Sequence, residues 1–456
     1  MNKSPTRELA RFVAELTYEK IPLPTIEHIK LCLLDTLGCG LFGSTLPWAK
    51  IVADFARDMG GKRESTLLGY HVKIAAPNAA LANGTAIHAF ELDDLHKTAI
   101  CHPGSVAVPP ALALAESIGG CNGKEFLTAI VAGYEVTIRV GMSVGTSHLQ
   151  KGFHPAATNG AFGAGAAAGR IIRLDADMMT HALGIAGTQA AGLMAAQYSA
   201  MVKRMHAGRA AQSGVYGALL ARRGLTGITN ILEAEYGGYC STMSDACDLE
   251  KLTVGLGKKF EAARVGFKPY AAGGSTHTSH EAVKSIMEKN NLTADMISKI
   301  TIHATTATYQ HTSWEYKPEG VTAAQMNTQY VVAITALEHE AFIDQFTEEK
   351  INDPGVIEFS RKVEVIPSPE LDKLGPELRH AVIAEIKTTD GRMFTERTDT
   401  AKGSERKPMS NDEVFRKYRI LSGKVLSKRR VAVLQDAVLN IEKIKDIREL
   451  GQLLMP

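Results

Sequence analysis

The chain has few aromatic residues, no close pair of cysteines and no long apolar run, and each absence excludes a class of protein. Phe, Tyr and Trp together make up only 6% of the 456 residues. The six cysteines are spread thinly and form no CxxC pair, so they indicate reduced thiols and leave an iron–sulfur cluster without a ligand set. No segment reaches the roughly 18 uninterrupted apolar residues that span a membrane, and the N-terminal residues lack the apolar stretch of a secretory signal. We therefore expect a soluble, cytoplasmic protein that has no membrane partner.

Net charge is also nearly absent. The sequence contains 51 basic and 49 acidic residues, for a formal charge of +2. This balance argues against binding a nucleic acid through bulk charge and against a polybasic membrane anchor. Charged residues at 22% and apolar residues at 45% are typical of a folded globular chain, which excludes disorder and collagen-like structure. Since aromatics are scarce while Ala is abundant and Gly numbers 41, the core must consist of small side chains.

A chain of this length exceeds the roughly 250–300 residues that one core supports, so two or three domains are expected. The first part is dominated by apolar residues at helical spacing. Helices are predicted at 24–34, 78–90, 105–118, 124–142, 159–172, 176–186 and 209–223. Residues 161–169 are almost entirely Ala and Gly, although each glycine weakens an isolated helix by up to about 1 kcal/mol. Such glycines are expected where neighbouring helices approach closely.

The pattern changes near residue 266. Alternating apolar residues predict strands at 300–303, 362–366, 381–386 and 392–396, and Asp390-Gly391 between the last two predicts a hairpin turn. Helices are predicted among them at 278–289 and 322–336, and again after Pro408 at 411–421 and 427–442. We therefore predict a mainly α fold with two domains. A large all-helical domain spans 1–266 and is completed by 403–456, a smaller α+β lid domain spans 267–402, and a cleft lies where they meet.

Four stretches place titratable residues within otherwise small or apolar sequence, at 91–105, 152–158, 198–209 and 267–277. In the first two, His102-Pro103 and His154-Pro155 each precede a predicted helix, whose N-terminal amides and dipole favour an anion. The other two stretches add basic and imidazole side chains, namely Lys203, His206, Arg209, Lys268 and His277. If the fold brings these groups together, they form a site for a small polyanion, and a carboxylate is the natural candidate. Neither a phosphate-binding Walker loop nor a dinucleotide fingerprint is present.

Each of these features also has a purely structural interpretation. A His-Pro pair before a helix can be a turn, and Lys203-Arg204 can be a solvated turn. Asp93 and Asp94 can end a helix, either in solvent or paired with a nearby Arg. Four residues, Asp93, Asp94, His96 and His102, are also of the types that ligate metals, but they lack the spacing of an HExxH motif or a facial triad. His277 and His280 are three residues apart and can share a helical face, so one of the two is expected to be incidental.

At the same four stretches the chain resembles the MmgE/PrpD family, which includes 2-methylcitrate dehydratases, cis-aconitate decarboxylases and iminodisuccinate epimerases. The resemblance covers essentially the whole chain. Its motifs are Asn83–Ala86, Glu91–Asp94, His102–Ser105, Gly152–Pro155, Met201–Lys203, Lys268–Tyr270, His277, Ala324–Met326 and Tyr330. Within the family, residues 195–204, 235–239 and 323–326 are most similar to the cis-aconitate decarboxylase branch.

The resemblance implies a helical domain with an α+β lid, a homodimer, an active site at the domain interface, and no metal or organic cofactor. Each family reaction passes through a carbanion-like or enediolate species beside a carboxylate, and cations stabilise the growing negative charge. Lys203, Lys268 and His277 are the candidates for that role. His102 is the candidate acid or base, because an imidazole exchanges protons at neutral pH.

The remaining candidates support these groups. Asp93 or Asp94 would orient His102, and His154 would act as a second proton-transfer or binding group. The residues expected to contact substrate are Thr98, Tyr270, His206, Arg209 and Gln325. We therefore expect a cofactor-independent lyase for a small di- or tricarboxylate, acting by decarboxylation of cis-aconitate or dehydration of 2-methylcitrate. The alternatives are a racemase or epimerase, and a carboxylate-binding protein without activity.

Overall fold

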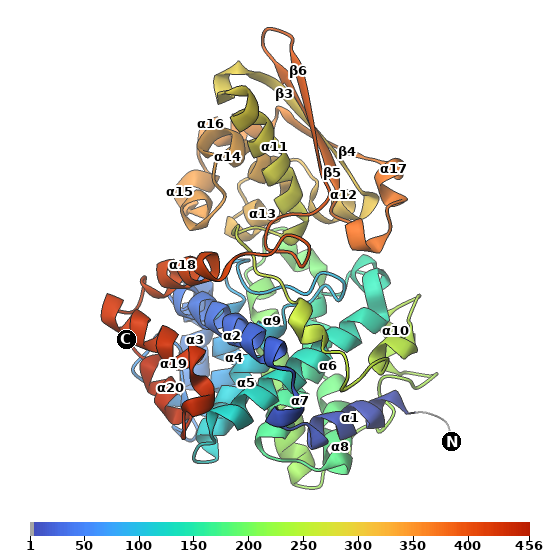
Figure 1. Cartoon of the computed structure of the whole chain (residues 1–456), viewed down its shortest axis with the longest axis vertical. Coiled ribbons are helices and arrows are strands. Elements are labelled where there is room, and N and C mark those ends of the chain that lie inside the picture. The colour runs from blue at the N-terminus through green and yellow to red at the C-terminus, as the bar shows by residue number, and fades with distance from the viewer. Residues whose placement is uncertain (1–3) are drawn as a thin grey trace.

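The computed structural model describes residues 4–456 and consists of two parts stacked along the long axis of the molecule (Figure 1). The lower part is helical and the upper part combines helices with a sheet, so the predicted mainly α fold with a smaller α+β region is confirmed. The helices below are α1 (Pro5–Glu15), α2 (Leu23–Gly43), α3 (Pro47–Asp58), α4 (Ala76–Ile87), α5 (Pro103–Ser117), α6 (Gly123–Gln150), α7 (Pro155–Ile171), α8 (Ala176–Gly187), α9 (Val202–Arg222) and α10 (Tyr239–Met243). The lower part also contains a short antiparallel pair of strands, β1 (Ser65–Thr66) and β2 (Lys73–Ile74).

Small residues allow the central helices to approach closely. In α7, a Cβ atom on Gly163 would lie 1.7 Å from the Thr137 hydroxyl of α6. In α9, a Cβ atom on Gly208 would lie 2.1 Å from the Leu81 carbonyl oxygen of α4. Both distances are far inside van der Waals contact, so only glycine fits without moving a helix. The expected close packing is confirmed, and it places the start of α9 beside the loop that follows α4.

One helix, α6, is long and apolar enough to span a membrane. However, 94% of its most apolar window is buried inside the protein. In the described part of the chain, α2 and α3 together pass the same test but meet at an angle of 88°. Helices α2 and α6 are largely buried, whereas α3 buries one face and leaves Ile51 and Phe55 exposed.

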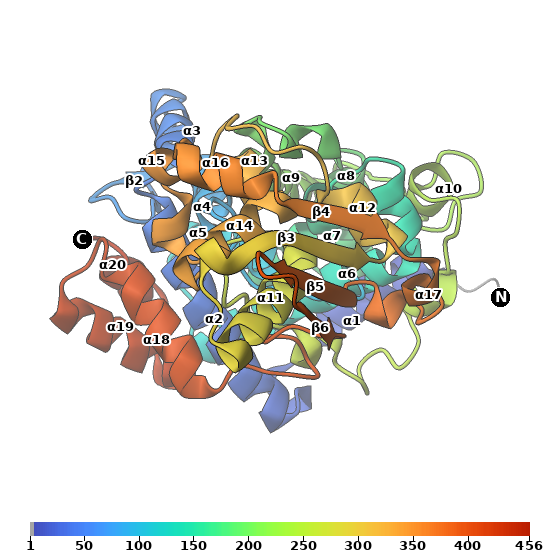
Figure 2. The ribbon, with the colours of Figure 1, turned by 90° about the horizontal axis from the view of Figure 1, so that it is seen from above.

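The upper part is built on a four-stranded sheet, in the order β4-β3-β5-β6. Its strands are β3 (Ile297–Ala304), β4 (Val363–Pro367), β5 (Val382–Thr388) and β6 (Met393–Thr398). Its helices are α11 (His277–Asn290), α12 (Thr306–Thr312), α13 (Val321–Gln325), α14 (Thr328–Glu338), α15 (Glu348–Ile351), α16 (Pro354–Ser360) and α17 (Pro369–Asp372), and Figure 2 shows them around the sheet. The predicted hairpin joins β5 to β6, and Gly391 adopts the positive φ of 90° that its turn needs.

The single helix predicted at 322–336 is wrong, because the structure divides it into α13 and α14. Asn327 interrupts the helix with an extended backbone, and its side chain accepts the amide hydrogen of Tyr330 as the N-cap of α14. Asparagine favours this arrangement, since its side chain competes with the helical backbone for hydrogen bonds.

The last helices, α18 (Asn411–Ser422), α19 (Lys428–Leu439) and α20 (Arg448–Leu453), return to the lower part, where α18 and α19 pack against α2 (Figure 1). One apolar core lies in the lower part, and a second fills the upper part and extends into the lower one through Phe42, Trp48 and Ala86. Helix α18 contributes to both cores. Val414 and Tyr418 belong to the lower core, whereas Leu421 belongs to the upper one. The assignment of residues 403–456 to the helical domain stays a prediction.

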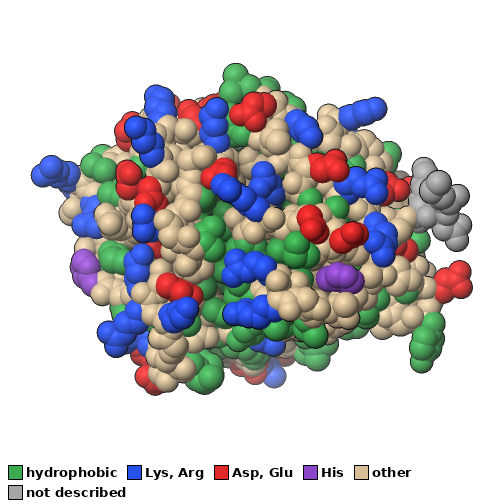
Figure 3. Space-filling model, turned by 90° about the horizontal axis from the view of Figure 1, so that it is seen from below, with side chains coloured by type: hydrophobic (Ala, Val, Ile, Leu, Met, Phe, Trp, Pro, Cys, Tyr) green, Lys and Arg blue, Asp and Glu red, His purple; other side chains and the backbone are tan. Residues whose placement is uncertain are grey.

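Seen from below, the helical part presents Lys and Arg interspersed with Asp and Glu (Figure 3). No single sign of charge gathers on this face, as expected from the balanced composition.

Candidate active site

A cavity of about 550 Å³ lies between the two parts of the molecule. The helical part contributes His102, His154 and Lys203 to its lining, and Lys268 comes from the connection between the parts. The α+β part contributes Ser275, His311, Arg379 and His380. Four of the predicted site residues therefore meet in one cavity, although His102 and Lys268 lie more than a third of the chain apart in the sequence.

His102 is positioned by the start of α5, as its His-Pro motif predicts. It is the N-cap residue and Pro103 is the first helical residue. The imidazole Nδ1 lies 2.7 Å from the Asp94 carbonyl oxygen, so Nδ1 must carry the hydrogen and donate it. The other nitrogen, Nε2, then carries a lone pair, and it has no hydrogen-bond partner among residues 4–456. His102 therefore offers a proton acceptor to the cavity.

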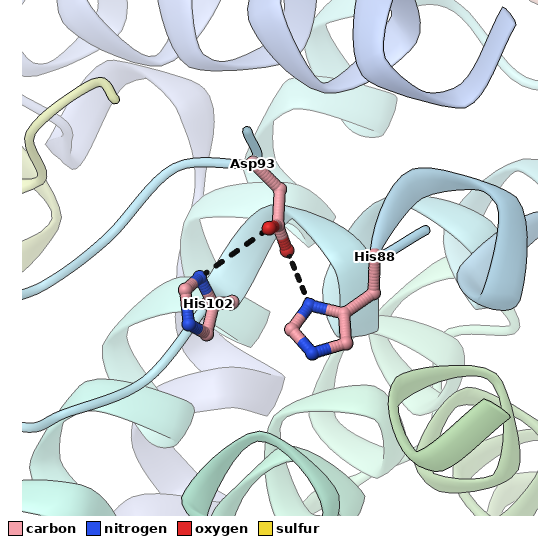
Figure 4. Close-up of side chains that lie close together, drawn as sticks. All are labelled: His88, Asp93 and His102. Atoms are coloured by element: carbon pink, nitrogen blue, oxygen red, sulfur yellow. Dashed lines mark hydrogen bonds and ion pairs between the residues drawn. The ribbon is translucent and has the colours of Figure 1, made fainter. Parts of the chain in front are cut away.

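The Asp93 carboxylate interacts with both His102 and His88 and so connects the two imidazoles (Figure 4). One Asp93 oxygen lies 3.6 Å from His102 Nδ1, and the other accepts a hydrogen bond of 2.8 Å from His88 Nδ1. Burial raises the pKa of the Asp93 carboxyl, but His102, His88 and the hydrogen bond from His88 outweigh burial and hold the pKa below its usual value. Burial lowers the pKa of His102 to about 3, although Asp93 opposes this change. The free protein thus holds a carboxylate beside a neutral imidazole.

Asp94 has a different role from its neighbour. Its two oxygens accept the Gly104 amide hydrogen of α5, at 3.0 Å, and the Tyr134 hydroxyl hydrogen, at 2.7 Å. Burial raises the pKa of the Asp94 carboxyl to about 8. An amide expected to bind a substrate anion at the start of α5 is therefore occupied by the protein's own side chain. The solvated helix end that was the alternative for Asp93 and Asp94 is wrong, since both are fully buried.

We expect Asp93→Asn to lower turnover by roughly 10–100-fold, the usual cost of losing an outer partner that orients a reacting imidazole. Asp94→Asn should lower it only a few-fold, because an amide can still accept from Gly104 and the Tyr134 hydroxyl can rotate to accept in turn. Steady-state rates of the two variants, with circular dichroism to check folding, make the comparison. Equal losses would contradict the separate roles assigned to these two carboxylates.

Glu91 organises the cations of the site. One of its carboxylate oxygens accepts a hydrogen bond of 2.9 Å from Lys268, and the other accepts from Lys203 and Arg204. Burial raises the pKa of Glu91, but Lys203, Lys268 and Arg204 outweigh burial and place it well below its usual value. Burial lowers the pKa of Lys203 to about 8, against the opposing charge of Glu91. One buried carboxylate thus pairs with three cations, and this cluster has a net positive charge.

This cluster corrects two expectations. Lys203 and Arg204 are buried in the first turn of α9, so the alternative of a solvated turn is wrong. Gln325 was expected to contact substrate, but its carbonyl oxygen accepts from Arg204 and its amide donates to the Phe90 and Ala271 carbonyl oxygens. Gln325 therefore fixes the Arg204 guanidinium. Sequence reasoning passed over Glu91, although a buried acid next to Asp93 and Asp94 was a usable signal.

Four imidazoles form a row along the helical side of the site. Ring centroids are separated by 5.0 Å from His102 to His88, 5.4 Å from His88 to His154 and 5.1 Å from His154 to His206. His154 is the N-cap of α7, and its Nδ1 lies 2.9 Å from Nδ1 of His206. Burial lowers the pKa of His154 well below its usual value and that of His206 to about 4. His88 was missed from the sequence, where nothing but its position five residues before Asp93 marks it.

The other predicted residues lie outside this cavity. Thr98 and His277 line a neighbouring cavity of about 750 Å³ that shares Lys268 and His380 with the first. The Tyr270 hydroxyl donates to Glu281, and the His280 imidazole is paired with the Thr335 hydroxyl. Arg209 is exposed on α9 and donates to Gln212 of the same helix, so the fold does not bring it to the site.

Among residues 4–456, the three groups with ligand-type atoms within 4.8 Å of one another are His88, Asp93 and His102. The alternative metal set that included Asp94 and His96 is not assembled. Asp94 is occupied as described, and Nδ1 of His96 accepts the Ala99 amide hydrogen. In the observed arrangement Nδ1 of His102 bears a hydrogen and His88 is bonded to Asp93, so these atoms form a hydrogen-bonded group in place of a coordination sphere.

Two family models match the chain, the MmgE/PrpD N-terminal domain at residues 7–250 and the MmgE/PrpD C-terminal domain at residues 270–443. The protein belongs to the MmgE/PrpD family. A cis-aconitate decarboxylase-like protein of Aspergillus oryzae is 32% identical, over 98% of this chain and 96% of its own. The cis-aconitate decarboxylase of Aspergillus terreus is 31% identical, over 98% and 95% of the two chains. The human cis-aconitate decarboxylase is 30% identical, over 100% and 95%.

Proposed function

We propose that this protein is a lyase that decarboxylates cis-aconitate to itaconate without a metal or organic cofactor. The observation that carries the proposal is a cavity between the two parts that is lined by His102 and by two cations held by Glu91, Lys203 and Lys268. Nε2 of His102 has no hydrogen-bond partner among residues 4–456. Relatives named cis-aconitate decarboxylase, aligned over nearly the whole chain, favour this tricarboxylate over other substrates of the same charge.

The reaction requires the removal of CO₂ and the delivery of one proton. When the carbon–carbon bond to the departing carboxylate breaks, its electron pair spreads over the carbon framework and the remaining carboxylates. Lys203 and Lys268 are already charged and fixed, so they stabilise this negative charge without reorganising. A proton must then reach carbon. His102 delivers it after becoming protonated in the complex, and the Asp93 carboxylate stabilises the imidazolium that forms.

Products formed in deuterated water test the proposal and separate it from other reactions at such a site. Purified protein is incubated with cis-aconitate, 2-methylcitrate or iminodisuccinate and followed by NMR. Itaconate carrying deuterium supports decarboxylation. Loss of water from 2-methylcitrate alone would replace the proposal with a dehydratase, and exchange of deuterium into iminodisuccinate without net change would replace it with an epimerase.

Two further parts of the proposal have direct measurements. Activity that survives exhaustive chelation is expected of a metal-free reaction, and activity restored only by added metal would contradict it. As implied for the family, we propose that the protein is a homodimer. From the thinly spread cysteines and the lack of a long apolar run, we propose that it is located in the cytoplasm. The mass in solution, measured by light scattering, should be twice that of one chain, 49.1 kDa.

Substrate binding should take up protons. In the free protein, burial places the pKa of His102 near 3 and that of His311 near 4, so both imidazoles are neutral at pH 7. A trianion in the cavity favours the protonated forms and raises these pKa values, so the complex binds more protons than the free protein. Affinity should therefore increase as the pH falls from 8 toward about 5. Calorimetry in buffers of different ionisation enthalpy measures the uptake, and proton release on binding would contradict this electrostatic account.

A further inference from the structure

Arg379 is a buried cation that the residues discussed so far do not neutralise. It lines the candidate cavity from the α+β side and is only 8% exposed. Within residues 4–456, no carboxylate lies within ion-pair distance of its guanidinium, and the nearest acidic influence is the charge of Glu377. Glu377 is itself exposed and accepts a hydrogen bond of 3.3 Å from Thr98. Burying an unpaired charge is energetically costly, so such a group is expected to have a partner that arrives from outside the chain.

The backbone that carries Arg379 is held firmly. It lies in the short connection between the turn at 376–378 and β5. The Arg379 carbonyl oxygen accepts from the hydroxyls of Thr305 and Thr308, and the His380 carbonyl oxygen accepts from Thr278. These three threonines come from α11 and from the start of α12. A position fixed in this way can present a side chain to a ligand with little loss of conformational freedom on binding.

Polar groups beside Arg379 complete a second half of the site. The Ser275 hydroxyl oxygen lies 3.0 Å from Nδ1 of His311 and 3.2 Å from Nε2 of His380. All three residues line the same cavity as Arg379. Burial lowers the pKa of His311 to about 4 and that of His380 well below its usual value, so Arg379 is the charged member of this group.

The charged groups on the helical side do not by themselves balance the charge of a tricarboxylate. Glu91 and Asp93 are two buried carboxylates, and they face the three cations Lys203, Arg204 and Lys268. That side therefore carries an excess of about one positive charge, which is less than a tricarboxylate requires. A guanidinium is well suited to bind the carboxylate that the helical side does not balance, because its planar fork binds a carboxylate through two parallel hydrogen bonds.

We infer that Arg379, supported by Ser275 and His311, binds the substrate carboxylate that lies farthest from His102 and makes the site selective for tricarboxylates over dicarboxylates. The inference rests on the proposed function, since it assumes that the cavity holds a polycarboxylate. It assigns Arg379 to substrate binding and leaves proton transfer to His102.

Binding of stable analogues tests this selectivity without turnover. Calorimetry compares tricarballylate with glutarate and methylsuccinate, each of which lacks one of its three carboxylates. Wild-type protein should prefer tricarballylate. Arg379→Gln should weaken tricarballylate about tenfold or more, as expected for lost charge-assisted hydrogen bonds, and change at least one dicarboxylate little. Arg379→Lys should restore part of the preference, and it serves as the test if the glutamine variant does not fold.

A matched control is Arg397→Gln, which removes an exposed arginine of β6 that is paired with Asp399. It should bind all three ligands like wild type. If Arg379→Gln keeps the wild-type preference for tricarballylate, the inference is overturned and the proposed function is not affected. Wild-type protein that binds no tricarboxylate would overturn both the inference and the proposed function. Wild-type protein that prefers tricarballylate through Arg379 but does not decarboxylate cis-aconitate would support the inference and refute the proposed reaction.

Discussion

Replacing His102 by alanine should lower turnover by roughly 10²-fold or more, the usual contribution of a general acid or base. The structure gives the physical reason. Nδ1 of His102 is fixed by the Asp94 carbonyl oxygen, Asp93 lies 3.6 Å away, and Nε2 has no partner among the described residues. His88 also pairs with Asp93 and has an Nε2 without a partner among the described residues, but this nitrogen is buried and His88 does not line the cavity. Rates with the substrate identified by NMR, measured from pH 5 to 9, make the test.

His280→Gln is the matched control for this variant. His280 is also a buried imidazole, but it lies on α11, is bonded to Thr335 and does not line the cavity. Its replacement should leave turnover within a few-fold of wild type. Near-normal activity of His102→Ala with the true substrate would remove His102 from the mechanism and direct attention to the His154–His206 pair.

Replacing Glu91 by glutamine should lower the free energy of unfolding by about 3–5 kcal/mol, the usual cost of breaking a buried ion pair from one side. Three cations, Lys203, Arg204 and Lys268, lose their common carboxylate, and all three are buried. Because whole domains are stable by only about 5–15 kcal/mol, this loss should be visible as a large fall in the urea midpoint.

A surface pair supplies the control for Glu91. Glu364 pairs with Lys299 across the sheet, and both side chains are 51% exposed. Glu364→Gln should therefore change the free energy of unfolding by no more than about 1 kcal/mol. The double variant Glu91→Gln with Lys203→Met should recover part of the lost stability, because it removes one uncompensated charge. Equal effects of Glu91→Gln and Glu364→Gln would show that the buried cluster is not held by Glu91.

Local patterns in the sequence were sufficient for most of the elements. Helical spacing, the two His-Pro motifs and the Asp-Gly turn each predicted an element that the structure contains, since periodicity, capping and turn chemistry act over a few residues. The helix at 322–336 failed for a local reason as well, because Asn327 caps a new helix inside an otherwise helical pattern.

The candidate site was predictable only in part. His102, Asp93, His154, Lys203 and Lys268 were found because they lie in polar stretches within apolar sequence, and the fold brings them together. Arg209 lies on the same helix as Lys203 but is exposed, because its direction around the helix decides whether it faces the cavity.

The sequence by itself determined that small residues allow close helix packing and that basic and imidazole side chains gather in a few short stretches. Tertiary structure alone decided which of these groups share a cavity and what charge they carry there. Glu91 becomes the partner of three cations only when residues 203, 204 and 268 are folded against it. Arg379 and His311 carry no local signal, and they belong to the site only because the α+β part closes over the helical part. Burial then sets the charge, since removing water favours neutral imidazoles and makes each unpaired cation a strong attractor for a carboxylate.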